Sequence, residues 1–284
     1  MDDVAAKALR GITIPSCPAI LTQLMTELRS PVTSNKKIAG LIIQDVGIAA
    51  MVIRSANSPL ISGNRRIESI SDAVNLLGFG SLANLVHEAL LQNSIGDNHA
   101  SLERFWDSSR YTAIASSKLA AIIGHVSPDT AYTFGLFHDC GIPLLAQRYP
   151  DYKTVLREAN QNAERMFTAI EDEAIGTSHA VLGYYLARSW GLSDAVTQGI
   201  LNHHDYAQLE DPRNIASDAH RLIAINVIAE YVARTHLRTA HDTEWTKALS
   251  AVAFFFGQSS ADISDLADDV IYQFDQALTS HDDD

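Results

Sequence analysis

Histidines and one aspartate are the residues whose types and spacing could carry chemistry in this chain of 284 residues. His138 is followed directly by Asp139, His179 comes 41 residues after His138, and the pair His203-His204 begins 24 residues after His179. Imidazole together with carboxylate suits Fe, Mn, Ni or Zn better than Ca or Mg. Because successive helical residues point about 100° apart, His138 and Asp139 can reach one ion only near a helix end. A metal site would therefore require three helix termini to converge.

A structural interpretation of the same residues competes with the metal site. The chain has 11 histidines. A histidine in the last turn of a helix is favoured by the helix dipole and by hydrogen bonds to free carbonyl groups. The spacing alone leaves metal binding and helix capping both open.

Helices are the elements that must position these residues. Apolar residues recur at helical spacing along the chain, as in Leu21, Leu24 and Leu28. Pro31 then ends the helix, because proline lacks an amide and clashes with the preceding turn. The pattern predicts a front bundle of short helices over about 15–95.

A second helical part is predicted from about residue 100. A helix runs through His138 and breaks at Gly141, and Ser178 is placed to cap a helix that begins at His179. Thr168 with Glu171 predicts a capping box, in which each side chain bonds a backbone amide of the same helix start.

Composition excludes several classes of function. The 34 acidic and 21 basic residues give a net charge of −13, which argues against a broad nucleic-acid-binding surface. No segment approaches the roughly 18 apolar residues of a membrane span, and the first residues do not resemble an export signal. Cys17 and Cys140 form no CxxC motif, so neither a disulfide framework nor a zinc knuckle is indicated. We expect a cytoplasmic protein that binds neither nucleic acid nor membrane.

Several segments, taken in order, resemble one known family. Glycine, two apolar residues and His138-Asp139 resemble the signature turn of the HD superfamily of metal-dependent phosphohydrolases. The ordered set resembles the HDOD domain, an HD-related output domain, over residues 14–205. The other matching segments are Pro15-x-x-Pro18, Ile42-Ile43-Gln44-Asp45, Arg54-Ser55-Ala56-Asn57-Ser58, His179-x-x-Leu182-Gly183 and Trp190-Gly191-Leu192.

The resemblance implies an all-α fold, a helical bundle like that of HD-domain phosphodiesterases with an additional N-terminal helical bundle. The front bundle would cover about 15–95 and the HD-like part about 100–205. The helices of 206–280 would pack on the HD-like part and complete it, and 281–284 would form an acidic tail.

The resemblance also implies which residues could bind a metal. An active HD hydrolase uses an upstream histidine, the His-Asp pair and a downstream aspartate. Ser108 stands at the expected place of the first and Asn226 at that of the last, so two ligand positions are lost. A hydroxyl binds these ions poorly, and an asparagine offers only a neutral carbonyl. The remaining candidate ligands are His138, Asp139, His179, His203 and His204, with Asp139 the candidate catalytic residue of an active enzyme.

The leading hypothesis is therefore a non-catalytic signalling and regulatory output module with a degenerate HD site and no resident metal. It would act through protein partners of a bacterial-type signalling pathway or through a ligand. The alternative is a phosphohydrolase of a nucleotide or cyclic dinucleotide that depends on Fe, Mn, Ni or Zn. A third hypothesis is a sensor that binds a nucleotide without cleaving it.

Overall fold

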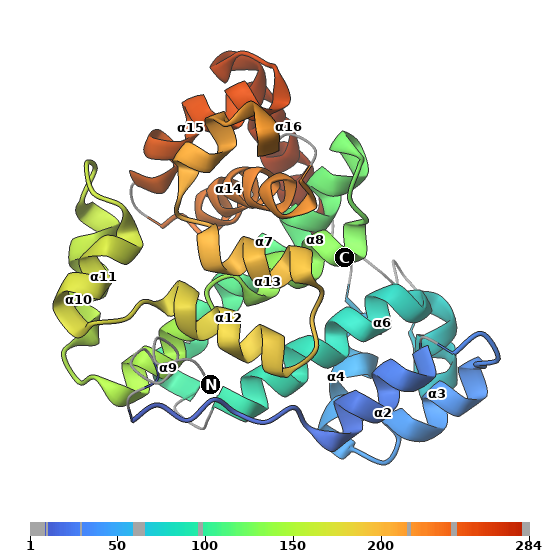
Figure 1. Ribbon diagram of the computed structural model, residues 1–284. Coiled ribbons are helices and arrows are strands. Elements are labelled where there is room, and N and C mark those ends of the chain that lie inside the picture. The colour runs from blue at the N-terminus through green and yellow to red at the C-terminus, as the bar shows by residue number, and fades with distance from the viewer. Residues whose placement is uncertain are drawn as a thin grey trace. The chain divides into compact units, whose positions relative to one another are not determined.

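The computed structural model describes residues 9, 11–28, 30–58, 66–95, 99–214, 217–239 and 243–279. Among these residues all regular elements are helices and none is a strand, which confirms the predicted all-α fold (Figure 1). The chain divides into two compact units. One combines Met1–Pro15 with Asn98–Tyr272, and the other combines Ser16–Asp97 with Gln273–Asp284.

The smaller unit is built on helices, several of which have starts that are capped by side chains. Ser34 accepts a hydrogen bond from the backbone amide of Lys37, and Asp45 accepts one from that of Ile48. These caps satisfy amides that have no partner inside the helix. The helices are α2 (Ala19–Leu28), α3 (Asn35–Ile42), α4 (Val46–Ala56) and α6 (Ile70–Ile95).

Gly78 breaks α6 into two helical stretches. Its φ of 72° lies in the left-handed region that glycine tolerates and other residues rarely adopt. Among the described helices α6 is long and apolar enough to cross a membrane, but 56% of its apolar window is buried inside the protein. The buried core helix of a soluble protein can be equally long and apolar. The length and composition of α6 are therefore weak support for a membrane span.

The larger unit carries the histidines. Its helices are α7 (His99–Ile123), α8 (Pro128–Phe137), α9 (Gly141–Arg148), α10 (Tyr152–Gln161), α11 (Phe167–Ile175), α12 (His179–Ser189), α13 (Asp194–Asn202), α14 (Asp218–His236), α15 (Thr243–Phe256) and most of α16 (Ser260–Thr279), with the 3-10 turns η1 (Tyr206–Glu210) and η2 (Pro212–Asn214).

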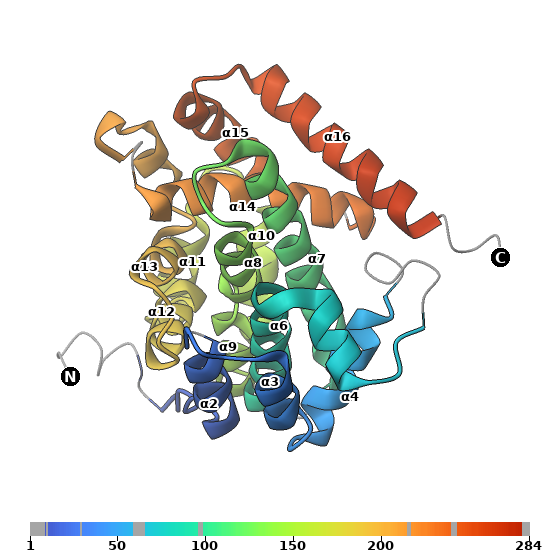
Figure 2. The same ribbon diagram turned by 90° about the vertical axis from the view of Figure 1, so that its right-hand side faces the viewer.

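Helix α14 is the buried centre of this unit. Eleven of its residues are buried, and it contacts α7, α8, α13 and α15. Helices α7 and α8 lie side by side (Figure 2). At their crossing Gly135 is needed, because an added Cβ would lie 2.9 Å from the Cα of Ala113 and 2.8 Å from the Oγ of Ser116. Close packing of this kind fixes the end of α8 relative to α14.

Gly141 makes a second close approach, between the turn after α8 and the start of α12. A Cβ at this position would lie 2.0 Å from the carbonyl oxygen of His179. Only a residue without a side chain lets the backbone of His179 come this close to the segment that carries His138 and Asp139. The close approach at Gly141 therefore brings two of the candidate ligand segments together.

We expect Gly141→Ala to lower the free energy of unfolding by about 3 kcal/mol, because the clash falls on backbone atoms that cannot move aside cheaply. Gly40→Ala in α3 is the control. Apart from its chain neighbours and the backbone of its own helix, no atom of the described residues lies within 4 Å of a Cβ added there. This control should be neutral or stabilising by about 0.5–1 kcal/mol, as for an unstrained helical glycine. Urea unfolding followed by circular dichroism measures both, and equal effects would contradict the assigned contact.

Candidate metal centre

Three helix ends supply the candidate ligands. His138 and Asp139 directly follow the last residue of α8, His179 is the first residue of α12, and His203 and His204 directly follow α13. Each of these helices begins at a serine whose side chain accepts an amide hydrogen bond, which fixes the helix start. The five candidate residues therefore come together from helix ends that are far apart in sequence.

The imidazole nitrogens of three histidines point at one another. The Nε2 atom of His179 lies 3.2 Å from the Nε2 of His203 and 3.2 Å from the Nε2 of His204. Oδ1 of Asp139 lies 3.2 Å from the Nε2 of His179 and 3.4 Å from that of His203. All four ligand atoms lie within 4.8 Å of one another. We call Asp139, His179, His203 and His204 the metal cluster.

A second group of ligand atoms shares Asp139. The Nε2 of His138 lies 3.3 Å from Oδ2 of Asp139 and 3.1 Å from Oε1 of Glu230, which projects from α14. Asp139 thus turns one carboxylate oxygen towards the metal cluster and the other towards His138. It is the member through which the two groups are connected.

Backbone carbonyls orient two of the four rings. The Nδ1 of His138 lies 2.8 Å from the carbonyl oxygen of Gly135, and that of His203 lies 2.7 Å from the carbonyl oxygen of Ile200. A carbonyl oxygen only accepts, so in each ring Nδ1 carries the proton. The Nε2 of a neutral ring is then left with a lone pair.

Carboxylates orient the other two rings. The Nδ1 of His179 lies 2.7 Å from Oε2 of Glu171, and the Nδ1 of His204 lies 2.9 Å from Oε2 of Glu244. Glutamates that accept from the far side of a ligating imidazole fix its orientation and raise its basicity. This arrangement is typical of metal sites and is not required for helix capping.

Tyrosines and a lysine hold these two glutamates in turn. The hydroxyl of Tyr152 donates to Glu171, and that of Tyr206 donates to Glu244 at 2.7 Å. The ammonium group of Lys247 lies 2.7 Å from the other oxygen of Glu244. Both carboxylates are therefore held by further donors in addition to the imidazoles.

The metal cluster is closed around its imidazoles and open at its carboxylate. The side chains of His179 and His203 are 0% and 2% exposed, whereas that of Asp139 is 21% exposed. The ring of Phe167 stacks on that of His204, with centroids 4.7 Å apart and planes 8° apart. Among the members of the metal cluster, Asp139 is therefore the one most accessible to water or a ligand.

A sequence model of the HDOD domain matches residues 14–206 of the chain. The chain belongs to the HDOD family. An uncharacterized protein of Treponema pallidum is 25% identical to it over 193 residues, which are 68% of this chain and 38% of that protein. The chain therefore spans well under half the length of this curated relative.

Solved structures share the HDOD fold. An HDOD domain protein of unknown function from Geobacter sulfurreducens is 25% identical, with a TM-score of 0.70 over 97% of this chain and 96% of that one. A candidate phosphohydrolase of Shewanella amazonensis is 21% identical, with a TM-score of 0.70 and the same coverage. A candidate signal transduction protein of Marinobacter aquaeolei is 22% identical, with a TM-score of 0.70 over 97% of this chain and 63% of that one.

The HDOD chain carries more negative than positive charge around these histidines. Glu230 lies 3.8 Å from the guanidinium of Arg234, and Glu244 pairs with Lys247. Four carboxylates thus face two cations, which leaves two negative charges for an ion or for protons to balance. The carboxylates are those of Asp139, Glu171, Glu230 and Glu244.

Two of the histidines bind protons strongly when no metal competes. Burial alone would lower the pKa of His138, but the charge of Asp139 and bonds to Asp139 and Glu230 raise it well above its usual value. Burial likewise opposes the protonation of His179, but the charge of Glu171 and a bond to Asp139 raise its pKa to about 10. Protons on these two rings can supply the balancing charge.

The pKa values of two other members of the metal cluster, His203 and Asp139, are lowered. Burial and the charge of neighbouring His204 lower the pKa of His203 to about 4, so this ring is neutral at pH 7. Burial alone would raise the pKa of Asp139, but the charge of His138 and bonds to the imidazoles hold it well below its usual value. The carboxylate and at least one imidazole are therefore already in the form that a metal requires.

The two positions expected to have lost a ligand lie on α7 and α14. Oδ1 of Asn226 lies 3.5 Å from the hydroxyl of Ser116, and Ser108 is a half-buried residue of α7. One helical turn after Asn226, α14 also carries Glu230, whose Oε1 lies 3.1 Å from the Nε2 of His138. The match of Ser108 and Asn226 to lost ligand positions stays a prediction.

Sequence reasoning missed three glutamates. The predicted capping box of Thr168 and Glu171 is wrong, because α11 begins at Phe167 and no side chain caps it. Glu171 turns instead to His179. Glu230 was detectable as a lone acid in the apolar stretch of α14, whereas Glu244 has no sequence signal, since it lies 40 residues from His204.

We expect the metal-free HDOD chain to lose stability as the pH rises from 7 to 10. The pKa of His179 is about 10 in the folded chain, against an ordinary value of 6.5 for a solvated histidine. Its contribution is therefore complete below about pH 6.5 and disappears as the pH approaches 10. Urea unfolding of the chelator-treated chain across this range measures the effect.

Glu171→Gln provides the control for this pH dependence. It removes the carboxylate charge beside His179, so the loss of stability between pH 7 and 10 should become smaller. An unfolding free energy that falls equally in both chains would show that His179 is not the group responsible.

Proposed function

We propose that this HDOD chain is a regulatory module that holds a divalent transition metal ion in the metal cluster and acts through binding rather than hydrolysis. The observation that carries the proposal is the approach of three imidazole Nε2 atoms to 3.2 Å, with Oδ1 of Asp139 beside them. Lone pairs that face one another in a buried space repel unless a cation or proton lies between them. A metal-binding module thus takes the place of the module without a resident metal that the sequence led us to expect.

The donor set favours Fe, Mn, Ni or Zn. Three imidazoles and one carboxylate suit these ions better than Ca or Mg, which prefer oxygen ligands. A bound ion would polarise a ligand oxygen and lower the pKa of bound water. Glu171 and Glu244 would hold the rings of His179 and His204 in place, and Phe167 would keep water away from His204.

Charge balance supports a role other than phosphate hydrolysis. One divalent ion would neutralise the two uncompensated negative charges around the histidines. A phosphate ester carries negative charge and needs a positive surplus in its transition state. The nearby cations, Lys247 and Arg234, are already paired with Glu244 and Glu230. Regulation through metal-dependent binding is therefore the better supported function.

The alternative function is a metal-dependent phosphohydrolase of a nucleotide or cyclic dinucleotide. It is favoured by the shared carboxylate of Asp139, which could connect two ions held by the metal cluster and by His138 with Glu230. Two ions would leave a positive surplus, and Asp139 is also the exposed member. The number of ions bound therefore separates the two functions.

The proposal also includes the partners and the cellular location of the protein. Matches to bacterial proteins, one of them named as a candidate signal transduction protein, support a bacterial-type signalling role with protein partners. A nucleotide ligand bound without cleavage would fit the sensor hypothesis. The net charge of −13 disfavours nucleic acid, and a cytoplasmic location agrees with these features.

We expect the purified, untagged chain to bind about one Fe, Mn, Ni or Zn ion, and His179→Ala to weaken binding more than tenfold, since an inner ligand is lost. The control is His125→Asn at an exposed residue with a φ of 70°, a conformation that asparagine tolerates. Elemental analysis gives the stoichiometry, and calorimetry in two buffers gives the protons released.

Proton release gives an independent check on the same binding site. Metal should displace the proton from the Nε2 of His179 at pH 7, so affinity should increase with pH. A chain without metal after growth in supplemented medium, or a His125→Asn chain that loses metal as fully as His179→Ala, would contradict the proposal.

We expect the chain loaded with one ion to leave nucleotides and cyclic dinucleotides intact, as measured by chromatography of the products. Hydrolysis that appears only when two ions are bound, and that Asp139→Asn abolishes, would replace the regulatory function by the phosphohydrolase. Hydrolysis that survives Asp139→Asn would come from a contaminant.

A further inference from the structure

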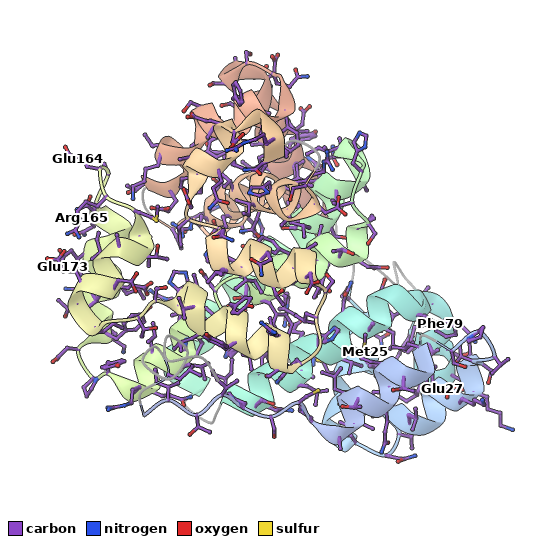
Figure 3. The ribbon with its side chains drawn as sticks, viewed as in Figure 1. Met25, Glu27, Phe79, Glu164, Arg165 and Glu173 are labelled. Atoms are coloured by element: carbon purple, nitrogen blue, oxygen red, sulfur yellow. The ribbon has the colours of Figure 1, made fainter. Side chains whose placement is uncertain are left out.

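The hairpin formed by α10 and α11 contacts α9, α12 and α15 and is also joined to the surroundings of the metal cluster. It has a small apolar core of its own, in which Ala159, Phe167 and Ile170 are buried and Val155 and Leu156 pack against them. In Figure 3 it lies at an edge of the unit, with the labelled Glu164, Arg165 and Glu173 on its outer side. A hairpin with a separate core can loosen without unfolding the rest of the chain.

The first connection runs to His179. Glu171 in α11 accepts from the ring Nδ1 at 2.7 Å and from the backbone amide of the same residue at 3.2 Å. Tyr152, in α10, donates to the other oxygen of Glu171. Both helices of the hairpin are thus joined to one cluster ring.

The second connection runs to His204 through ring contact. Phe167, the first residue of α11, stacks on His204 and meets the ring of His179 edge-on, with centroids 5.2 Å apart. Phe167 also belongs to the core of the hairpin. A movement of the His204 ring would therefore change the packing of Phe167 in that core.

The third connection passes through Lys247. Its ammonium group donates to the carbonyl oxygen of Arg165 at 2.8 Å and to Glu244 at 2.7 Å. Glu244 holds the Nδ1 of His204 at 2.9 Å. Lys247 is 12% exposed and thereby connects the loop between α10 and α11 to a cluster ring.

We propose that the α10–α11 hairpin covers the closed side of the metal cluster and is held there when the cluster contains a cation, with Lys247 as the positioning residue that connects the two. This inference rests on the proposed metal site. A cation keeps the rings of His179 and His204 together. Without it no metal bonds join these rings, so they move apart more easily and the three connections to the hairpin weaken.

Hydrogen–deuterium exchange of the full chain, with and without Zn²⁺ or Mn²⁺, tests the proposal. We expect metal to slow exchange of the amides of residues 162–175 by roughly tenfold, as for a locally opening unit. At a metal concentration that saturates both chains, as shown by elemental analysis, Lys247→Met should lose most of this protection. Lys153→Met is the matched control, because Lys153 is an exposed lysine of the same hairpin.

The outcomes separate this proposal from the proposed function. Metal binding without any change in hairpin exchange of the unaltered chain overturns the coupling and leaves the metal site standing. Failure to bind metal overturns both. If Lys247→Met does not fold, Lys247→Arg, which keeps a donor for both acceptors, should retain the protection. If Lys153→Met loses as much protection as Lys247→Met, Lys247 does not connect the hairpin to the metal cluster.

Discussion

The approach of several imidazole lone pairs within one buried space is the interaction on which the rest of the larger unit depends. Such a group is stable only with positive charge at its centre. Each ring must also be prevented from turning away, and the chain does this with an acceptor on every Nδ1: carbonyls for His138 and His203, carboxylates for His179 and His204. Helix ends, glycine contacts and buried glutamates all serve this one arrangement.

Charge balance then connects the site to its function. Burying four carboxylates is costly unless each is paired, and Lys247 and Arg234 pair with only two of them. The remaining charge can be met by protons on His138 and His179 or by one divalent ion, and these two states exclude each other at His179. A site that exchanges protons for metal while remaining neutral is suited to report occupancy. A site that activates phosphate needs an excess of positive charge, which here requires a second ion.

The sequence predicted the helices and the convergence of their ends better than it predicted the surroundings of the site. Capping serines are local signals, and Ser178 acts as such a signal predicts, whereas the predicted helix end at Gly141 is wrong, because α8 ends at Phe137 and Gly141 is the first residue of α9. Glu171 was misassigned because the same residue type serves a cap or a distant imidazole, and only packing decides between them. Asn226 was matched by linear pattern, and the carboxylate of Glu230 went unnoticed although it lies one turn later on the same face of α14, because a helix presents neighbouring turns on one face. The metal-binding role of the five candidate residues stays a prediction.

The closed and open sides of the metal cluster have different consequences. On the closed side, Phe167 and Glu171 bring a peripheral hairpin into contact with ligand rings, so that the free energy of metal binding is shared with the order of that hairpin. On the open side, Asp139 faces both the cluster and His138, and is the member that solvent reaches. In the proposed site, ligand entry and hairpin order therefore involve different sides of the metal cluster. Because each face contacts the rings or carboxylate that hold the ion, binding at one face must alter the free energy of the other by the same amount.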